Sequence, residues 1–375
     1  MINPVYEKLA NIAVEYSLEV QKGDYVVIIG PPLAKELFQA FQIKILKAGA
    51  HVDLIPKLAD TQAIFFQYAS EEQLSKVKSI EALLAKQVDC LVEILSGYNT
   101  RSLSSVDPHK LSKYIDSPER KEVKEIFEER SLKGELKWVI VPYPCQANAQ
   151  EASMNLLAYS DFVFKSLFLD KENPTEEWRK LHKNQEIAIK YLNQVDHIQV
   201  LGKETDLSLS VKGRKWKNCS GQNNLPDGEV YTGPIEDSVN GHITFTYPGL
   251  YFGKEIEDIY LEFKDGKVIN AHARKGEELL NELLKIESAN IIGEFAIGTN
   301  YGVTKFTKNM LFDEKMGGTI HCALGLGFED TGSKNKSTVH WDILKDMKIP
   351  GSKIIADGNV IYEEGKLKIN SKFIK

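Results

Sequence analysis

The stretch "YVVIIGPPLAKELFQAFQIKILKAGAHVDLI" (residues 25–55) decides the fold of the first half of the chain. Residues 25–29 form an apolar run with the length of a buried strand, and Gly30-Pro31-Pro32 interrupts it. A helix is expected over about 34–48, where Gly49 ends it, and a second strand near 51–55. Strand, helix and strand in this order predict a parallel βαβ unit.

The same alternation continues on both sides of this stretch. Helices are expected near 4–18, 71–86 and 175–193, and strands near 90–95 and 138–142. The charged segment 116–135 is typical of a helix with a solvated face. Together these elements predict an α/β domain with a parallel sheet over residues 1–195.

The pattern changes after residue 195. "HIQVLG" (197–202) and "DLSLSVKG" (206–213) indicate strands, and "IYLEFKDGKVINAHARK" (259–275) indicates a hairpin around a Lys-Asp-Gly-Lys turn. Residues 277–284 are expected to be helical, and short strands with glycine-rich turns fill most of the remainder. We therefore expect a β-rich α+β domain over residues 196–375.

Composition excludes several classes of function. With 375 residues and a net charge of −6, the chain has no surplus of Lys and Arg for nucleic-acid binding. No apolar run has the length of a membrane-spanning helix, and the N-terminus lacks the features of a signal peptide. Four widely spaced cysteines argue against a disulfide framework or a cysteine-built zinc site. We expect a cytoplasmic protein with neither nucleic acid nor membrane as a partner.

Nucleotide cofactors are not indicated either. "IIGPPLAKE" lacks the glycine triplet of a dinucleotide site, and "GLGFED" (325–330) has Asp330 where a glycine is required. No Walker-type phosphate loop is present in the sequence.

Candidate metal ligands collect in four segments of the second half. These are Glu229 in "NNLPDGEVYTGPIEDSVNG" (223–241), Glu294 in "IIGEFAIGTN" (291–300), Glu314 and His321 in "LFDEKMGGTIHCALGLGF" (311–328), and His340 with Asp342 in "VHWD". Oxygen and nitrogen donors without thiolates suit Zn²⁺, Co²⁺ or Mn²⁺ held as a pair. On a strand, His340 and Asp342 would point to one side and Trp341 to the other.

Each of these residues also has a purely structural interpretation. Glu229 fits a turn, Glu294 a solvated edge strand, Glu314 a surface charge, and His321 a hydrogen-bonded core histidine. His51-Val52-Asp53 has the same form as His340-Trp341-Asp342, and we interpret that pair as part of a strand.

The same segments resemble the aminopeptidase T (thermophilic aminopeptidase) family of two-metal exopeptidases. "LPDGEVYTGPIEDSVNG", "GEFAIGTN", "LFDEKMGGTIHCALG" and "STVHWD" carry the resemblance in this order. "QKGDYVVIIG" (21–30) and "KAGAHVDL" (47–54) extend it over nearly the whole chain.

The resemblance implies an aminopeptidase that removes N-terminal residues from peptides, with a water activated between two divalent ions, which would be Zn²⁺, Co²⁺, Mn²⁺ or Mg²⁺. It implies a metal-binding C-terminal domain, a peptide substrate with a free N-terminus, and a homodimer. Glu294 would bridge the two ions and serve as the catalytic carboxylate. The implied metal ligands are Glu229, Glu294, Glu314, His321, His340 and Asp342. The family places the acid somewhat closer to the histidine than Glu314 stands to His321.

A second departure concerns the reacting carbonyl. The family pattern has a tyrosine seven residues after the "ALG" histidine, where this chain has Phe328. A phenol donates a hydrogen bond to a developing oxyanion and a phenyl ring does not. Tyr231 and Tyr301 are candidates for the missing donor.

Two alternatives to peptidase activity stay open at this level. A two-metal phosphoesterase would use nearby lysines for the phosphate, namely Lys305, Lys308, Lys315, Lys334 and Lys336. Otherwise the chain would be a metal-bound dimer whose peptidase activity is weak or lost because of Phe328. In the peptidase interpretation, Asp313, Glu236 or Asp237 would contact the substrate's α-ammonium.

Overall fold

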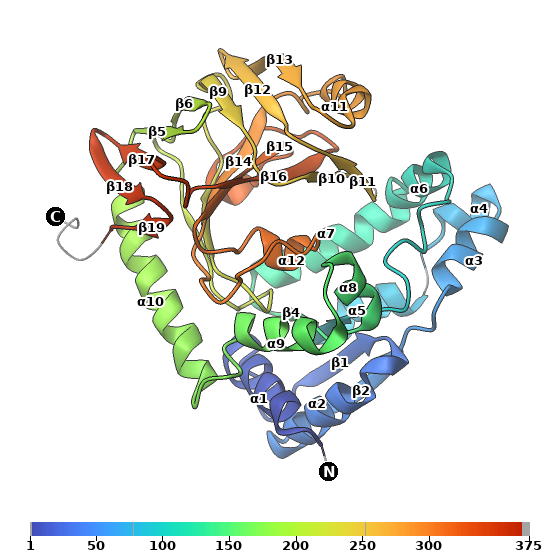
Figure 1. Ribbon diagram of the computed structural model, residues 1–375. Coiled ribbons are helices and arrows are strands. Elements are labelled where there is room, and N and C mark those ends of the chain that lie inside the picture. The colour runs from blue at the N-terminus through green and yellow to red at the C-terminus, as the bar shows by residue number, and fades with distance from the viewer. Residues whose placement is uncertain (1, 78, 252, 370–375) are drawn as a thin grey trace. The chain divides into compact units, whose positions relative to one another are not determined.

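The computed structural model describes residues 2–77, 79–251 and 253–369, and divides them into two compact units (Figure 1). The first unit runs to Thr175 and includes Gly221–Pro226, and the second comprises Glu176–Ser220 and the chain from Asp227 onward. The domain boundary predicted at residues 195 and 196 stays a prediction. This grouping places most of the long helix α10 (Pro174–Leu192) in the second unit.

The first unit contains a four-stranded parallel sheet. Its strands are β1 (Tyr25–Gly30), β2 (His51–Pro56), β3 (Cys90–Leu95) and β4 (Lys137–Pro142), in the order β2-β1-β3-β4. The opening stretch forms β1, helix α2 (Lys35–Lys47) and β2, so the predicted parallel βαβ unit is confirmed. Val26, Val27 and Ile28 of β1 are buried because this strand lies inside the sheet.

Helices make up most of the remainder of the first unit (Figure 1). They are α1 (Pro4–Ile12) with a π-helical continuation (Ala13–Ser17), a 3₁₀ turn (Pro32–Ala34), α3 (Thr61–Tyr68), α4 (Glu71–Ser75), α5 (Ser79–Gln87), α6 (Pro108–Ile115), α7 (Pro118–Leu132), α8 (Gln146–Glu151) and α9 (Leu156–Ser166). Helix α7 buries none of its own residues, as the charge pattern of 116–135 predicted.

One predicted helix is divided in the structure. The helix expected over 71–86 appears as α4 and α5, because the backbone of Lys76 is extended with φ −84° and ψ 135°. Tertiary contacts hold this break, since Glu119 accepts hydrogen bonds from Lys76 Nζ at 2.8 Å and from the Val77 amide at 3.1 Å. Such long-range contacts are not visible in a local pattern.

The second unit consists mainly of antiparallel sheets. An eight-stranded sheet has the order β13-β12-β9-β6-β5-β17-β18-β19, a five-stranded sheet the order β16-β15-β14-β8-β7, and β10 pairs with β11. Helix α11 (Glu277–Leu284), the short helix α12 (Met310–Asp313) and a 3₁₀ turn (Glu329–Thr331) complete it. The bounds of the strands are β5 (His197–Gly202), β6 (Thr205–Ser210), β7 (Lys217–Cys219), β8 (Glu229–Thr232), β9 (Asn240–Thr244), β10 (Gly249–Tyr251), β11 (Lys254–Ile256), β12 (Tyr260–Lys264), β13 (Lys267–His272), β14 (Ile292–Gly298), β15 (Thr319–Gly325), β16 (His340–Asp346), β17 (Lys353–Ala356), β18 (Asn359–Glu363) and β19 (Lys366–Leu367).

The predicted hairpin is present as β12 and β13. Lys264 pairs with Lys267, so Asp265 and Gly266 form a two-residue turn. Both have positive φ, 48° and 81°, which matches the backbone twist that favours an Asp-Gly turn between antiparallel strands.

The two units confirm the predicted fold class, an α/β part with a parallel sheet followed by a β-rich α+β part. The core of the second unit includes Phe245, Phe295 and Trp341, and receives one face of the five-stranded sheet. No helix within the described residues is long and apolar enough to cross a membrane.

Candidate metal centre

The five-stranded sheet brings four of its strands to one site. Glu229 comes from β8, Glu294 from β14, His321 from β15, and His340 with Asp342 from β16. These strands lie side by side in the second unit, where Figure 1 shows β14, β15 and β16 in orange and red. Because alternate residues of a strand share a face, the register of this sheet determines which side chains meet.

The register places small residues between the candidate ligands. Glu294 lies opposite Ala323, which lies opposite Asp342 on the next strand. Gly298 lies opposite Glu229, and Gly325 lies opposite His340. We infer that these small residues leave room for the longer ligand side chains to converge on this face.

The opposite face of the same strands is apolar and buried. Phe295, Cys322 and Trp341 alternate with the candidate ligands and belong to the core of the unit. The predicted alternation in "HWD" is therefore present, with Trp341 in the core and its two neighbours on the other face.

A bulge at Gly293 determines how Glu294 is presented. The pairing of β14 with β15 shifts between Ile292 and Glu294. A Cβ at position 293 would lie 2.2 Å from the Gly325 carbonyl oxygen and 2.5 Å from that of Leu326. Only glycine permits this close approach, and a bulge of this kind redirects the following side chain.

All six candidate ligands come together in the structure. Three overlapping groups have ligand atoms within 4.8 Å of one another: Glu229–Glu294–His321, Glu294–His340–Asp342, and Glu314–His321–Asp342. Glu294 is 3% exposed and lies on an interior strand, so the solvated edge-strand interpretation is wrong. Glu229 is buried on β8 and is not a surface turn residue.

The two imidazoles face the carboxylates with their Nε2 atoms. His321 Nε2 lies 3.4 Å from Glu229 Oε2 and 3.5 Å from Glu294 Oε1. His340 Nε2 lies 3.4 Å from Glu294 Oε2 and 3.5 Å from Asp342 Oδ2. Each oxygen of Glu294 therefore faces a different imidazole.

A main-chain contact orients His340. Its Nδ1 lies 2.9 Å from the Leu326 carbonyl oxygen, which can only accept a hydrogen bond. Because Nδ1 donates to this carbonyl oxygen, Nε2 is the ring nitrogen that faces the carboxylates. This arrangement is the usual one for a metal-binding histidine.

Burial and mutual charge shift the pKa values of the cluster. Burial is the largest influence on Glu294 and raises its pKa above the usual range. Burial alone would lower the pKa of His321, but Glu294, Glu229 and Asp342 together raise it to about 9. The pKa of Asp342 falls to about 2 although burial opposes this, because His340 and His321 face it. The site therefore favours bound positive charge.

Lys315 belongs to this site as a partner of carboxylates, a role that the sequence did not predict. Its Nζ lies 2.6 Å from Glu229 Oε1, 2.5 Å from Glu314 Oε1 and 3.8 Å from Asp227 Oδ1. Its side chain is 3% exposed. An Asp-Glu-Lys triplet normally indicates surface charge, so the local sequence carried no signal of this burial.

Cys219 and Asp227 also approach the cluster and were not predicted. Together with Glu229 they form a fourth group with ligand atoms within 4.8 Å. Burial, followed by the charges of Asp227 and Glu229, raises the pKa of the Cys219 thiol well above its ordinary value.

Phe328 lies at the edge of the site. Its ring is 5.2 Å from the His340 ring and 5.4 Å from the Tyr231 ring, centroid to centroid. Tyr231 shares its strand face with Glu229, two residues away. The Tyr301 hydroxyl instead donates a hydrogen bond to the Gly365 carbonyl oxygen at 2.9 Å.

The remaining candidate charges have other contacts or are exposed. Asp313 accepts hydrogen bonds from the Thr307 amide and hydroxyl, and Glu236 pairs with Arg214 at 2.6 Å. Lys308 pairs with Glu255, whereas the rest are exposed, namely Asp237, Lys305, Lys334 and Lys336. The phosphate-binding lysine cluster is thus not assembled around the ligands.

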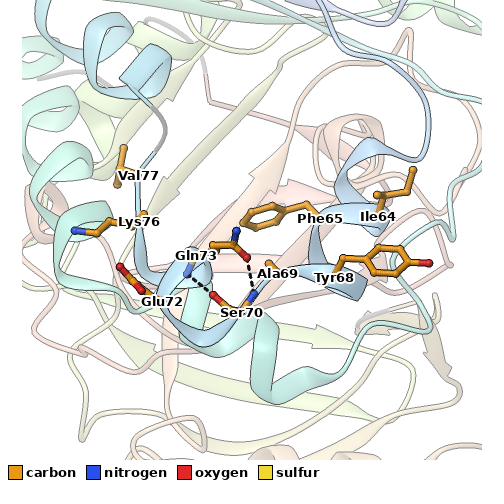
Figure 2. Close-up of a pocket in the computed structure, with 9 residues that line it drawn as sticks. All are labelled: Ile64, Phe65, Tyr68, Ala69, Ser70, Glu72, Gln73, Lys76 and Val77. Carbon is orange, nitrogen blue, oxygen red and sulfur yellow. Dashed lines mark hydrogen bonds between the residues drawn. The ribbon is translucent and has the colours of Figure 1, made fainter.

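Two other features are separate from this chemistry. The His51-Val52-Asp53 segment lies on edge strand β2, where Asp53 accepts a hydrogen bond from the Tyr25 hydroxyl. The first unit also has a groove of about 800 Å³, and Figure 2 shows the side chains that line it. Its lining contains no candidate ligand and comprises Ile64, Phe65, Tyr68, Ala69, Ser70, Glu72, Gln73, Lys76 and Val77.

Two curated relatives of similar sequence are named as aminopeptidases, and one solved structure has a similar fold. Aminopeptidase AmpS of Bacillus subtilis is 25% identical over 93% of this chain and 94% of its own length. Aminopeptidase T of Thermus thermophilus is 25% identical over 96% of this chain and 95% of its own length. The solved structure of wild-type AmpT from Thermus thermophilus matches with a TM-score of 0.83 at 21% identity, over 98% of this chain and all of that one.

The family model described as thermophilic metalloprotease (M29) matches residues 3–367. That range contains every residue of the cluster described above. The chain belongs to the M29 family of thermophilic metalloproteases.

Proposed function

We propose that this chain is a metal-dependent aminopeptidase that holds two divalent ions at the cluster on the five-stranded sheet. The observation that carries the proposal is the convergence of four carboxylates and two imidazoles on one sheet face of an M29 chain. Curated relatives named as aminopeptidases support the substrate class, a peptide with a free N-terminus.

The residues present fit divalent ions. Glu229 Oε2 and Asp342 Oδ1 are buried and make no hydrogen bond within the described part of the chain. Both lie toward His321 Nε2, at 3.4 and 4.0 Å. Buried carboxylate oxygens that lack donors are costly unless a cation meets them. Oxygen and imidazole donors of this kind suit Zn²⁺, Co²⁺ or Mn²⁺.

Glu294 is the proposed bridging ligand. It is the one residue common to the groups Glu229–Glu294–His321 and Glu294–His340–Asp342. Its two oxygens face the two imidazoles separately, as a carboxylate between two ions requires. Glu314, beside His321 and Asp342 in a third group, is the proposed sixth ligand.

Ions bound here would supply Lewis-acid activation of water and of the scissile carbonyl. The chain's own residues provide the proton path. Glu294, or a neighbour such as Glu229, is the proposed acceptor of the proton that the attacking water loses, and it returns that proton to the leaving amine.

The experiment uses the purified chain before and after chelation. Aminoacyl-p-nitroanilides should be cleaved, cleavage should stop after full metal removal, and Co²⁺, Zn²⁺ or Mn²⁺ should restore it. An N-acetylated aminoacyl-p-nitroanilide is the matched control and should resist cleavage. Activity that survives complete chelation, or equal cleavage of the acetylated substrate, would refute the proposal.

Bis-p-nitrophenyl phosphate tests the phosphoesterase alternative in the same assay. The structure does not favour it, because Lys315 contacts carboxylates and Lys334 and Lys336 are exposed. Two bound ions without activity on either substrate would support the metal-bound scaffold instead. The homodimer and the cytoplasmic location stay predictions, and sedimentation analysis of the purified chain tests the former.

A further inference from the structure

Lys315 is a buried cation that the proposed reaction does not use. It follows Glu314 at the end of α12, and its main chain is held on both sides. The Lys315 amide donates to the Phe312 carbonyl oxygen at 3.1 Å, and its carbonyl oxygen accepts from the Asn300 amide at 3.0 Å. These two main-chain hydrogen bonds hold the backbone that places the ammonium group in the cluster.

The Lys315 ammonium group contacts one carboxylate oxygen of Glu229 and one of Glu314. Lys315 Nζ binds Glu229 Oε1 at 2.6 Å, whereas Glu229 Oε2 has no hydrogen bond within the described residues and lies 3.4 Å from His321 Nε2. It also contacts Glu314 Oε1 at 2.5 Å. One oxygen of each carboxylate is therefore occupied, and Oε2 of Glu229 is directed toward the other candidate ligands.

The positive charge of Lys315 also helps to balance the negative charge of the cluster. Five carboxylates meet here: Asp227, Glu229, Glu294, Glu314 and Asp342. Two divalent ions would neutralise four of them, and one ammonium neutralises the fifth. A buried ion pair is tolerated when its geometry is good and its hydrogen bonds are satisfied, and Lys315 has two carboxylate oxygens within 2.6 Å.

We propose that Lys315 is a positioning residue of the metal centre, which holds Glu229 and Glu314 by one oxygen each so that they present the other to the ions. The inference rests on the proposed function, because it assumes that these carboxylates are ligands. Partners behind metal ligands typically change metal affinity by about 10–100-fold when they are removed.

The first test compares two buried lysines of the same unit. Lys315→Met removes the ammonium and keeps similar bulk. Lys345→Met is the matched control, since Lys345 is also buried but donates to the carbonyl oxygens of Lys203 and Thr244. Co²⁺ is titrated calorimetrically into chelator-stripped, full-length protein. Lys315→Met should bind about 10–100-fold more weakly, and the control within about threefold of the unmodified chain. Unchanged or tighter binding by Lys315→Met would overturn the proposal.

A double-variant cycle separates positioning from general stabilisation. If Lys315 acts through Glu229 as well as Glu314, Lys315→Met in a Glu229→Gln background should weaken Co²⁺ binding by clearly less than in the unmodified background, because only the contact with Glu314 is then left to lose. A loss as large as in the unmodified background would mean that Lys315 acts independently of Glu229, against the proposal.

If Lys315→Met does not fold, a crystal structure of the unmodified chain with Co²⁺ decides. Lys315 Nζ should stay within hydrogen-bond distance of Glu229 and Glu314, and its departure from either would overturn the proposal. A chain that binds Co²⁺ but cleaves no peptide would refute the proposed function and leave the lysine result standing. A chain that binds no divalent ion would refute both.

Discussion

Phe328 lies beside His340, where the resemblance described above implies a tyrosine, and this difference stays a prediction. Its ring contacts His340 and Tyr231, and 39% of it is exposed. Burial and nearby charges raise the pKa of Tyr231 above the usual range, so this phenol keeps its proton and can donate. The chain thus has one phenol, that of Tyr231, beside the position where the resemblance implies a tyrosine.

Phe328→Tyr should increase kcat if the missing donor limits turnover. One donor to a developing oxyanion is worth about 10²–10³ in rate, so we expect a gain of at least about tenfold. Initial rates on an aminoacyl-p-nitroanilide at saturating substrate measure it. Tyr231→Phe is the companion variant: a large loss there, with no gain from Phe328→Tyr, would mean that Tyr231 already supplies the donor.

The buried amine of Lys345 should make the free energy of unfolding depend on pH. Burial lowers its folded pKa to about 8, from an ordinary value of 10.5. The unfolded chain therefore binds the proton more tightly than the folded chain between pH 8 and 10.5. The free energy of unfolding should therefore rise with pH across this window, by up to ~3 kcal/mol. The destabilisation that comes from burying the protonated amine should be fully present below pH 8.

Urea unfolding at pH 7.5, 9 and 10 checks this for the unmodified chain and for Lys345→Met. The variant lacks the titrating amine, so its unfolding free energy should rise less over the same interval. Parallel pH profiles for the two proteins would contradict the prediction.

At the scale of elements, strands β14, β15 and β16 are the framework of the site. Their alternation could be predicted locally, because "HWD" and "IHC" place donors on one face and apolar groups on the other. The bulge at Gly293 could not, because its cause is the carbonyl oxygens of Gly325 and Leu326 on a distant segment. The divided helix at Lys76 has a similar origin, since Glu119 holds the break.

Gly293→Ala should destabilise the chain and loosen the site. Its new Cβ would lie 2.2 Å from the Gly325 carbonyl oxygen, so β14 or β15 must shift. We expect a loss of about 1–3 kcal/mol in unfolding free energy and weaker metal binding. Gly97→Ala is the matched control, because its Cβ would meet no atom within 4 Å. Urea unfolding compares the two, and equal effects would argue against the close approach.

At the scale of the whole molecule, metal binding and folding should be linked. The cluster gathers five carboxylates and lies entirely in the second unit. Ions that bind only the folded chain stabilise it by mass action, which amounts to about 2.7 kcal/mol at a hundredfold excess over Kd.

Thermal unfolding with Co²⁺ and with a chelator tests this linkage. The transition of the second unit should move to higher temperature with metal, whereas Glu294→Gln should show a smaller shift. Glu278→Gln, an exposed acid on α11, is the control and should respond like the unmodified chain. An identical Tm with and without metal would count against a metal centre in this unit.

The sequence by itself determined the fold class, the parallel βαβ arrangement of the first half and the identity of six candidate ligands. These follow from local signals, namely the periodicity of apolar residues, turn residues and the types of donor atoms. The tertiary structure alone decided which groups surround those ligands. Lys315 looks like surface charge in "DEK" but is buried against Glu229, 86 residues earlier in the chain. A local sequence pattern carries no information about contacts between residues that are distant in the chain. Once such residues are buried, a charged side chain is stable only if a group of opposite charge is paired with it.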